Sequence, residues 1–178
     1  MALNLSDRNE LPNFLSGVGV EIGVFLGEYS HRLLRDSRLS LLVSVDLWQQ
    51  DGGYYPTQEV ADQVFDRCKS LLSDFSSRSL VLRMSGQQAS LGFHGNSLDF
   101  IYIDSSHGYQ ETLEQLTLWY PKMKRRSIMA GHDYANGPEV QQAVGEFAAA
   151  HRLTIETTTR DMEFIAYGQV NSWLILLP

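Results

Sequence analysis

The segment E-I-G-V-F-L-G-E-Y-S at residues 21–30 constrains the fold of this chain more than any other. It predicts the end of a buried strand, a turn that contains Gly23 and Gly27, and then the start of a helix. A second apolar run, L-L-V-S-V-D, ends at Asp46. A strand, a turn, a helix and a second strand are the first half of a parallel α/β sheet. We therefore expect a ligand site where these strands end.

Apolar runs of strand length alternate with helical stretches along the whole chain. The predicted strands are 18–24, 41–45, 80–84, 98–103, 127–130, 153–156, 163–166 and 173–177, and the predicted helices are 29–36, 57–75, 109–120 and 139–151. Nearly continuous apolar strands are typical of a parallel sheet that is covered on both faces. The pattern predicts a doubly wound α/β fold in one domain, residues 1–178, with an N-terminal extension at 1–16.

Composition and charge exclude several classes of partner. The net charge of −7 argues against a dedicated nucleic-acid-binding protein, and the basic cluster at 122–126 is interpreted as a solvated loop. No apolar run approaches the ~20 residues of a membrane span, and no signal peptide is visible, so we expect no membrane partner and a cytoplasmic location. The single cysteine, Cys68, lies in a helical pattern, which predicts a packing role.

The glycine spacing and the neighbouring acids indicate the class of ligand. Gly23 and Gly27 are separated by three residues, which differs from the G-x-G-x-x-G pattern that holds a pyrophosphate. Asp46 ends the second strand, where a carboxylate can accept hydrogen bonds from ribose hydroxyls; a turn or helix cap is the alternative role. Glu21 lies inside an apolar strand and requires a hydrogen-bonding or cationic partner. These features favour a nucleoside ligand without phosphates.

A second group of polar residues follows the fourth and fifth predicted strands. Asp104 ends I-Y-I-D, and His107 lies three residues later. His132 and Asp133 follow the fifth strand, in G-H-D-Y. The two aspartates can converge at one sheet edge, where they would repel each other unless a cation neutralises them. Carboxylates with an imidazole permit Mg²⁺, Mn²⁺ or Zn²⁺, and His107 is a candidate general base. Helix capping and local hydrogen bonds are the alternative.

These residues together resemble the class I S-adenosylmethionine-dependent methyltransferases, and most closely their small-molecule O-methyltransferase branch. The segments I-D-S-S-H-G-Y-Q and G-H-D-Y are similar to a subfamily with I-D-x-x-H-x-Y and G-H-D-Y. The resemblance implies a Rossmann-like, seven-stranded, mostly parallel sheet with a reversed final hairpin. It also implies methyl transfer from S-adenosylmethionine to the hydroxyl of a small-molecule acceptor, with or without Mg²⁺ or another divalent cation.

The resemblance assigns roles to individual residues. His107 and Asp104 would be catalytic. Asp104, His132 and Asp133 would hold the metal ion, although relatives that depend on a metal commonly carry two acidic or amide residues where His132 and Asp133 stand. The residues expected to contact the cofactor are Glu21, Gly23, Phe25, Ser30, Asp46, Leu47, Ser85, Gln87 and Asp104.

Two other functions remain open from the sequence. A nucleotide-linked oxidoreductase could use a Rossmann-like sheet, but the missing third glycine weighs against it. A non-catalytic domain could keep the fold, but it would have no need of acids and histidines at the strand ends. Apolar strands near the C-terminus are compatible with a homodimer. The acceptor stays open among sugars, phenols and hydroxy acids.

Overall fold

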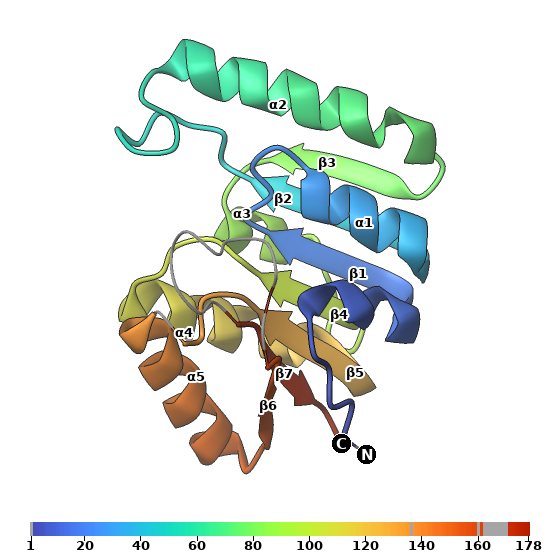
Figure 1. The fold of residues 1–178 in the computed structure, drawn as a ribbon, viewed down its shortest axis with the longest axis vertical. Coiled ribbons are helices and arrows are strands. Elements are labelled where there is room, and N and C mark those ends of the chain that lie inside the picture. The colour runs from blue at the N-terminus through green and yellow to red at the C-terminus, as the bar shows by residue number, and fades with distance from the viewer. Residues whose placement is uncertain (1, 136, 160, 162–170) are drawn as a thin grey trace.

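The computed structural model describes residues 2–135, 137–159, 161 and 171–178 (Figure 1). The strands are β1 (Ser16–Ile22), β2 (Arg38–Asp46), β3 (Ser79–Arg83), β4 (Leu98–Ile103), β5 (Met123–Gly131), β6 (Ile155–Thr157) and β7 (Trp173–Leu176). The α-helices are α1 (Glu28–Asp36), α2 (Gln58–Leu72), α3 (Gly86–Ser90), α4 (Tyr109–Trp119) and α5 (Pro138–His151). Short 3₁₀ helices are η1 (Arg8–Phe14), η2 (Ser73–Phe75) and η3 (Tyr120–Lys122).

The strands form one seven-stranded sheet in the order β3-β2-β1-β4-β5-β7-β6. The first five strands are parallel, and β7 runs antiparallel to both of its neighbours. The predicted fold class, a Rossmann-like doubly wound sheet with a reversed final hairpin, is therefore confirmed. The chain moves outward from β1 to β3 and then returns to the other side of β1, so the order reverses between β1 and β4. Ligands of such sheets bind at this point, beyond the carboxyl ends of the strands.

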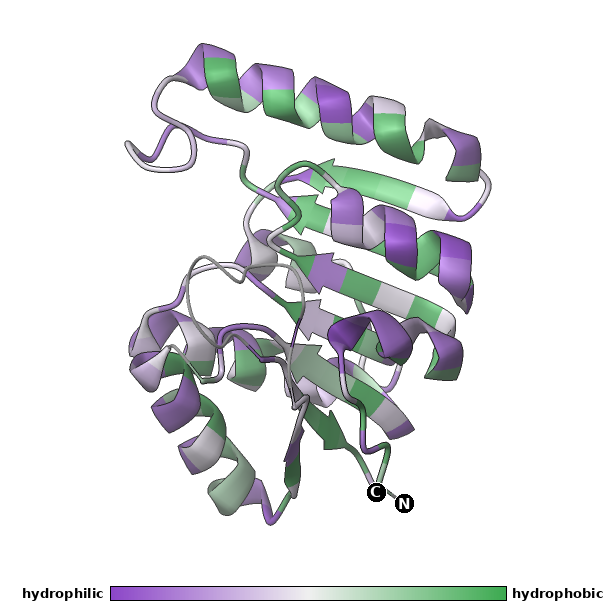
Figure 2. Ribbon diagram, in the orientation of Figure 1, coloured by the Kyte–Doolittle hydropathy of each residue, from purple (hydrophilic) through white to green (hydrophobic). Residues whose placement is uncertain are grey.

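Alternate residues of the central strands enter two hydrophobic layers, one on each face of the sheet. In β4, Phe100 and Tyr102 join the layer formed with α1, α2 and η1, whereas Ile101 and Ile103 join the layer formed with α4 and α5. Figure 2 shows the corresponding apolar colour along the strands and mixed colours on the helices. Cys68 is fully buried in α2, as its predicted packing role requires. Within the described residues, every helix is too short or too polar to cross a bilayer.

The N-terminal residues pack against the sheet, and the sequence contained no signal for this arrangement. Helix η1 lies beside α1 on the same face, with Leu11 fully buried (Figure 1). The backbone N–H of Leu3 donates to Glu156 at 2.8 Å, and that of Arg8 donates to Asp161 at 2.8 Å. The segment expected as an extension is thus held by residues near the other end of the chain.

The structure corrects several predicted boundaries. Strand β2 begins at Arg38 and β5 begins at Met123, so both are longer than their apolar runs. The interpretation of residues 122–126 as a loop is wrong, because most of them belong to β5, where Lys124 pairs with Asp99 at 2.8 Å. A polar strand start is tolerated there because its side chains face solvent. The predicted strand 163–166 lies outside the described residues.

A glycine is required at position 23, where β1 and β4 end side by side. Gly23 has φ +84°, and a Cβ added there would lie 1.9 Å from the carbonyl oxygen of Asp104. Its N–H donates to Val45 O at 2.9 Å, which fixes the turn against β2. A side chain at this position would therefore push two strand ends apart.

We expect Gly23→Ala to destabilise the protein much more than Gly52→Ala. Both glycines have φ near +80°, and this backbone conformation costs an L-residue about 1–2 kcal/mol. A Cβ at Gly52 would meet nothing within 4 Å, so only the Gly23 variant adds a collision with backbone. Urea unfolding of both variants measures the difference. Equal losses in the free energy of unfolding would contradict the close approach of β1 and β4.

Candidate functional site

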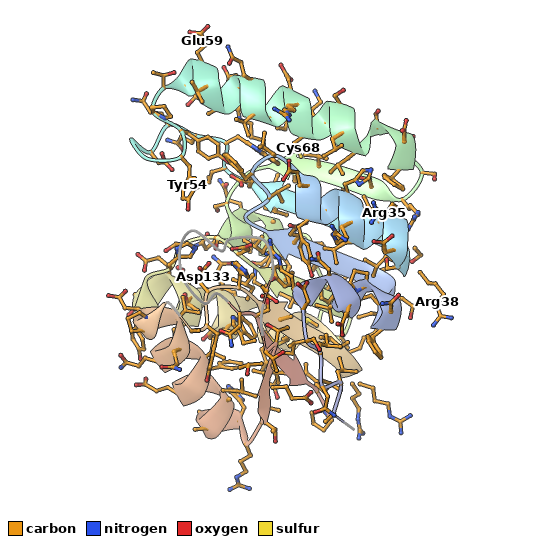
Figure 3. All side chains as sticks on the ribbon, in the orientation of Figure 1. Arg35, Arg38, Tyr54, Glu59, Cys68 and Asp133 are labelled. Atoms are coloured by element: carbon orange, nitrogen blue, oxygen red, sulfur yellow. The ribbon has the colours of Figure 1, made fainter. Side chains whose placement is uncertain are left out.

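Four acidic residues that are distant in sequence meet at the carboxyl edge of the sheet. Glu21 is near the end of β1, Asp46 ends β2, and Asp104 and Asp133 follow β4 and β5. Backbone hydrogen bonds from Asp104 N to Ile22 O (2.8 Å) and from His132 N to Ile103 O (3.1 Å) join the neighbouring strand ends. Figure 3 shows Asp133 and Tyr54 on the side toward which the strands point, and Arg38 on the opposite side.

The Asp46 carboxylate braces the glycine turn. Its Oδ2 accepts hydrogen bonds from the backbone N–H groups of Val24 and Phe25, both at 2.9 Å, and from the Tyr55 hydroxyl at 3.3 Å. Its Oδ1 accepts from Trp48 N at 2.9 Å. Because a carboxylate oxygen has two lone pairs, Oδ1 can accept a further hydrogen bond, such as one from a ribose hydroxyl.

A cavity of about 340 Å³ opens beside Asp46, at the ends of β2 and β3. It is lined by Leu47, Trp48, Gln49, Gln58, Arg83, Met84 and Gln88. Apolar Leu47 and Met84 with an amide group nearby suit a flat heteroaromatic base. The cavity therefore adjoins the place where a ribose would bind, as one nucleoside requires.

The predicted base contacts Ser85 and Gln87 both have local partners in the structure. Ser85 caps α3, because its Oγ accepts a hydrogen bond from Gln88 N at 3.1 Å. The Gln87 amide donates to Glu114 at 2.9 Å. Gln88, which follows the same strand but was not among the residues assigned to the cofactor, lines the cavity. The capping motif S-x-x-Q is the alternative role for Ser85, and the structure shows this cap.

Aromatic side chains stand at the mouth of the site. Phe25 is 40% exposed, and its ring centroid lies 5.8 Å from that of Tyr54 and 5.9 Å from that of Tyr55. Phe25 has a positive φ of 50°, which is uncommon for a large residue and is held by the Asp46 hydrogen bond. The loop that carries the two tyrosines thus lies against the glycine turn.

Glu21 is a buried carboxyl group with a polar partner. It is 2% exposed and accepts a hydrogen bond from Ser30 Oγ, which also lies 2.8 Å from Ser44 Oγ. Burial, with the negative charge of Asp104, raises the pKa of Glu21 from 4.5 to about 8 despite the Ser30 hydrogen bond. Glu21 is therefore mostly protonated at neutral pH, and a cation bound beside it would favour the ionised form.

Arg8 reaches the site from η1 and was not identified in the sequence analysis. Its Nη1 lies 3.2 Å from Asp104 Oδ2 and donates to the Tyr102 hydroxyl at 3.4 Å. Its guanidinium carbon lies 4.6 Å from the centroid of the Tyr29 ring. A single arginine in an N-terminal segment carries no motif, so only the fold reveals its position.

Asp104, His107 and Asp133 form a cluster whose potential ligand atoms all lie within 4.8 Å of one another. Two carboxylates and an imidazole suit Mn²⁺ or Zn²⁺, and the carboxylates also suit Mg²⁺. His107 Nε2 lies 3.0 Å from Asp133 Oδ2, and this hydrogen bond raises the pKa of His107. Burial opposes ionisation of Asp133, but hydrogen bonds from His107 and His132 hold its pKa well below the ordinary range.

His132, which the sequence analysis placed in the metal set, lies beside this cluster. The ring is 8% exposed, with Nδ1 at 3.2 Å from Asp133 Oδ2 and Nε2 at 3.6 Å from Asp161 Oδ2. Asp161 is buried and also accepts a hydrogen bond from Ser172 Oγ at 2.7 Å. The described geometry gathers His107 with the two aspartates, and a ligand role for His132 stays a prediction. Asp161, like Arg8, was missed by the sequence analysis.

The sequence and fold are shared with known proteins. A family described as a methyltransferase domain matches residues 20–134, which run from the last residues of β1 through β5 and include the acidic edge. An uncharacterized protein, y4gI, from Sinorhizobium fredii is 26% identical over 92 residues, or 51% of this chain. The match covers 10% of that relative, so this chain aligns with a small part of its length.

Two solved structures show the same fold. The O-methyltransferase from Bacillus cereus in complex with SAH has a TM-score of 0.64 and 16% identity, covering 89% of this chain and 73% of that one. A putative rRNA methylase from Clostridium thermocellum has a TM-score of 0.70 and 12% identity, covering 100% of both chains. At such identities the likeness shows the fold alone. These two proteins are named for different acceptors, so the fold does not select one.

We expect Glu21→Gln to stabilise the ligand-free protein at pH 8 but not at pH 4. In the unfolded chain Glu21 loses its proton near pH 4.5, whereas in the folded protein it keeps the proton up to about pH 8. The free energy of unfolding of the wild type therefore falls as the pH rises from 4.5 to 8. Glutamine does not ionise, so the variant does not lose this stability. At pH 8 its free energy of unfolding should exceed that of the wild type by about 1.4 kcal/mol for each unit of the pKa shift, or a few kcal/mol. Thermal unfolding across this pH range measures it, with Glu59→Gln on the exposed face of α2 as the control.

Proposed function

We propose that this chain, which belongs to the methyltransferase domain family, transfers the methyl group of S-adenosylmethionine to a hydroxyl oxygen of a small molecule. One observation carries the proposal. Glu21, Asp46 and Asp104 end three neighbouring strands, with the glycine turn between them and a cavity on the β3 side. These polar groups and the turn at Gly23, where a Cβ would meet backbone, lie at the edge where parallel sheets bind their ligands.

The residues at this edge fit each part of S-adenosylmethionine. Asp46 has capacity for ribose hydroxyls, and the cavity beside Leu47 and Met84 suits adenine. Asp104 supplies negative charge for the ammonium group and the sulfonium, and these positive charges would favour the ionised form of Glu21 beside them. The turn at Gly23 leaves no room for a side chain, so backbone can contact the ligand directly. When bound, S-adenosylmethionine supplies an electrophilic methyl group on a positively charged sulfur.

The properties of the edge support a small acceptor with a hydroxyl group. His107 has a half-exposed side chain, and Asp133 orients its ring through Nε2 at 3.0 Å. In its neutral form the other ring nitrogen can take a proton from an acceptor hydroxyl. The acidic edge and the net charge of −7 would repel the phosphates of RNA. A small neutral acceptor meets no such repulsion.

A metal-assisted form of the reaction is supported by the cluster of Asp104, His107 and Asp133. A divalent ion bound there would lower the pKa of a coordinated hydroxyl and fix its orientation. In this form His107 acts as a ligand, and the acceptor proton leaves to another base. In the metal-free form His107 is itself the base. The two forms make opposite predictions for chelation.

Calorimetric titration with S-adenosylhomocysteine tests the cofactor assignment. We expect the wild type to bind and Asp46→Asn to bind at least about tenfold more weakly, since loss of a charged hydrogen bond costs about 1.5–3 kcal/mol. Asparagine keeps one oxygen to brace the turn, so ligand-free stability should change less than for Asp46→Ala. Asp66→Asn, at an exposed position of α2, is the matched control. A wild type that does not bind would refute the proposal.

The histidine assignment is tested by NMR titration of the His107 ring protons, which needs no acceptor. Asp133→Asn removes the hydrogen bond and charge that raise the pKa of His107, so this pKa should fall toward the ordinary histidine value. The base form then predicts that the rise of activity with pH also moves to lower pH in this variant. An unchanged His107 titration would contradict the observed pair.

The metal-assisted form is tested in the same samples. If an ion binds the cluster, Mn²⁺ should broaden the His107 signals in the wild type and much less in Asp133→Asn. EDTA should then abolish methyl transfer, and Mg²⁺ or Mn²⁺ should restore it. Full activity in EDTA would refute the metal-assisted form and favour the form in which His107 is the base.

A further inference from the structure

A buried arginine lies next to the acidic edge, although its backbone belongs to the N-terminal segment. Arg8 pairs with Asp104, its charge favours the ionised form of Glu21, and its guanidinium lies over Tyr29 of α1. Tyr29 in turn donates its hydroxyl to the carbonyl oxygen of Arg8 at 3.1 Å. The backbone N–H of Arg8 donates to buried Asp161 at 2.8 Å. The arginine is thus fixed in place at both its backbone and its side chain.

The proposed cofactor imposes a charge requirement on this corner of the site. Its methionyl end carries an ammonium group and a carboxylate on the same carbon. Glu21 and Asp104 suit the ammonium group, but they would repel the carboxylate unless a cation lies near it. Burying a carboxylate without a counter-charge is costly. The corner therefore needs one positive group beside its two acids.

Arg8 meets this requirement among the described residues. Arg83 also lies at the carboxyl edge, but it ends β3 on the cavity side and pairs with Asp62 at 2.5 Å. Strand β3 is separated from β1 by β2, so Arg83 faces the base end of the ligand. A guanidinium is always charged and presents five N–H donors in a planar fork, which suits two carboxylates at once.

We infer that Arg8 binds the α-carboxylate of the methionyl group of S-adenosylmethionine, while Asp104 and Glu21 face its ammonium group. This inference rests on the proposed function and deepens it. It makes the N-terminal segment part of the cofactor site. Stacking on Tyr29 and the two backbone hydrogen bonds hold the guanidinium ready, so little freedom is lost when the carboxylate binds.

The test compares two ligands that differ only in the carboxylate, S-adenosylmethionine and decarboxylated S-adenosylmethionine. Their affinities are measured by calorimetry for the wild type, Arg8→Met and Arg8→Lys, with Arg38→Met at the exposed start of β2 as the control. We expect the wild type to prefer S-adenosylmethionine by about tenfold to a hundredfold, the range for a hydrogen-bonded charge pair. In Arg8→Met this preference should disappear, while the decarboxylated ligand keeps its affinity.

The outcomes separate the inference from the proposed function. Retained binding of the decarboxylated ligand by Arg8→Met shows an intact site and supports the carboxylate contact. Equal losses for both ligands would assign Arg8 a purely structural role through Asp104 and overturn the inference. The inference would also be overturned if Arg8→Met still preferred S-adenosylmethionine to the decarboxylated ligand as strongly as the wild type does. Arg8→Lys, which retains the charge, should keep an intermediate preference and covers the case in which Arg8→Met does not fold. A wild type that binds neither ligand would refute the proposed function itself.

Discussion

The hydrogen bonds between the Asp46 carboxylate and the turn that contains Gly23 fix the positions of the other site residues. Asp46 belongs to β2, yet its Oδ2 accepts the N–H groups of Val24 and Phe25 that follow β1. These groups have no partner of their own in a tight turn, and the carboxylate satisfies both. The position of α1, which begins directly after the turn, therefore depends on the end of another strand. A ligand bound to Asp46 would contact the same rigid unit.

Charge at the edge is balanced by burial and by one arginine. Burial near Asp104 raises the pKa of Glu21 and favours its neutral form, whereas Asp104 has a cation, Arg8, at 3.2 Å. Asp133 is held in its charged form by two histidine rings. The repulsion between these acids is thus reduced in three ways: by protonation of Glu21, by the Arg8 charge beside Asp104, and by histidine hydrogen bonds to Asp133. Such separation of ionisation behaviour among close groups is typical of sites that bind or transform a charged ligand.

The sequence predicted the alternation of strands and helices and the acids at the strand ends, because both follow from local periodicity. Strand β4 was predicted with its observed limits, Leu98–Ile103. The start of β5 was missed, since only Met123 pairs with β4 there and the basic residues that follow lie in a register shift, which local periodicity does not indicate. Arg8 and Asp161 could not be found, because their places depend on packing between distant segments. The roles assigned to the site residues, those of Ser85, Gln87 and His132 included, stay predictions.

The contacts between Leu3 and Glu156 and between Arg8 and Asp161 each join residues that are 153 positions apart. During synthesis, an N-terminal segment emerges from the ribosome long before the residues that hold it. Strands β1 to β5 can pair before the first dozen residues dock against the sheet. Contacts of such large sequence separation are slow to form. Docking of the N-terminal segment beside Asp104 is thus a late event in folding, and nascent chains stalled before residue 156 would lack both residues that hold this segment.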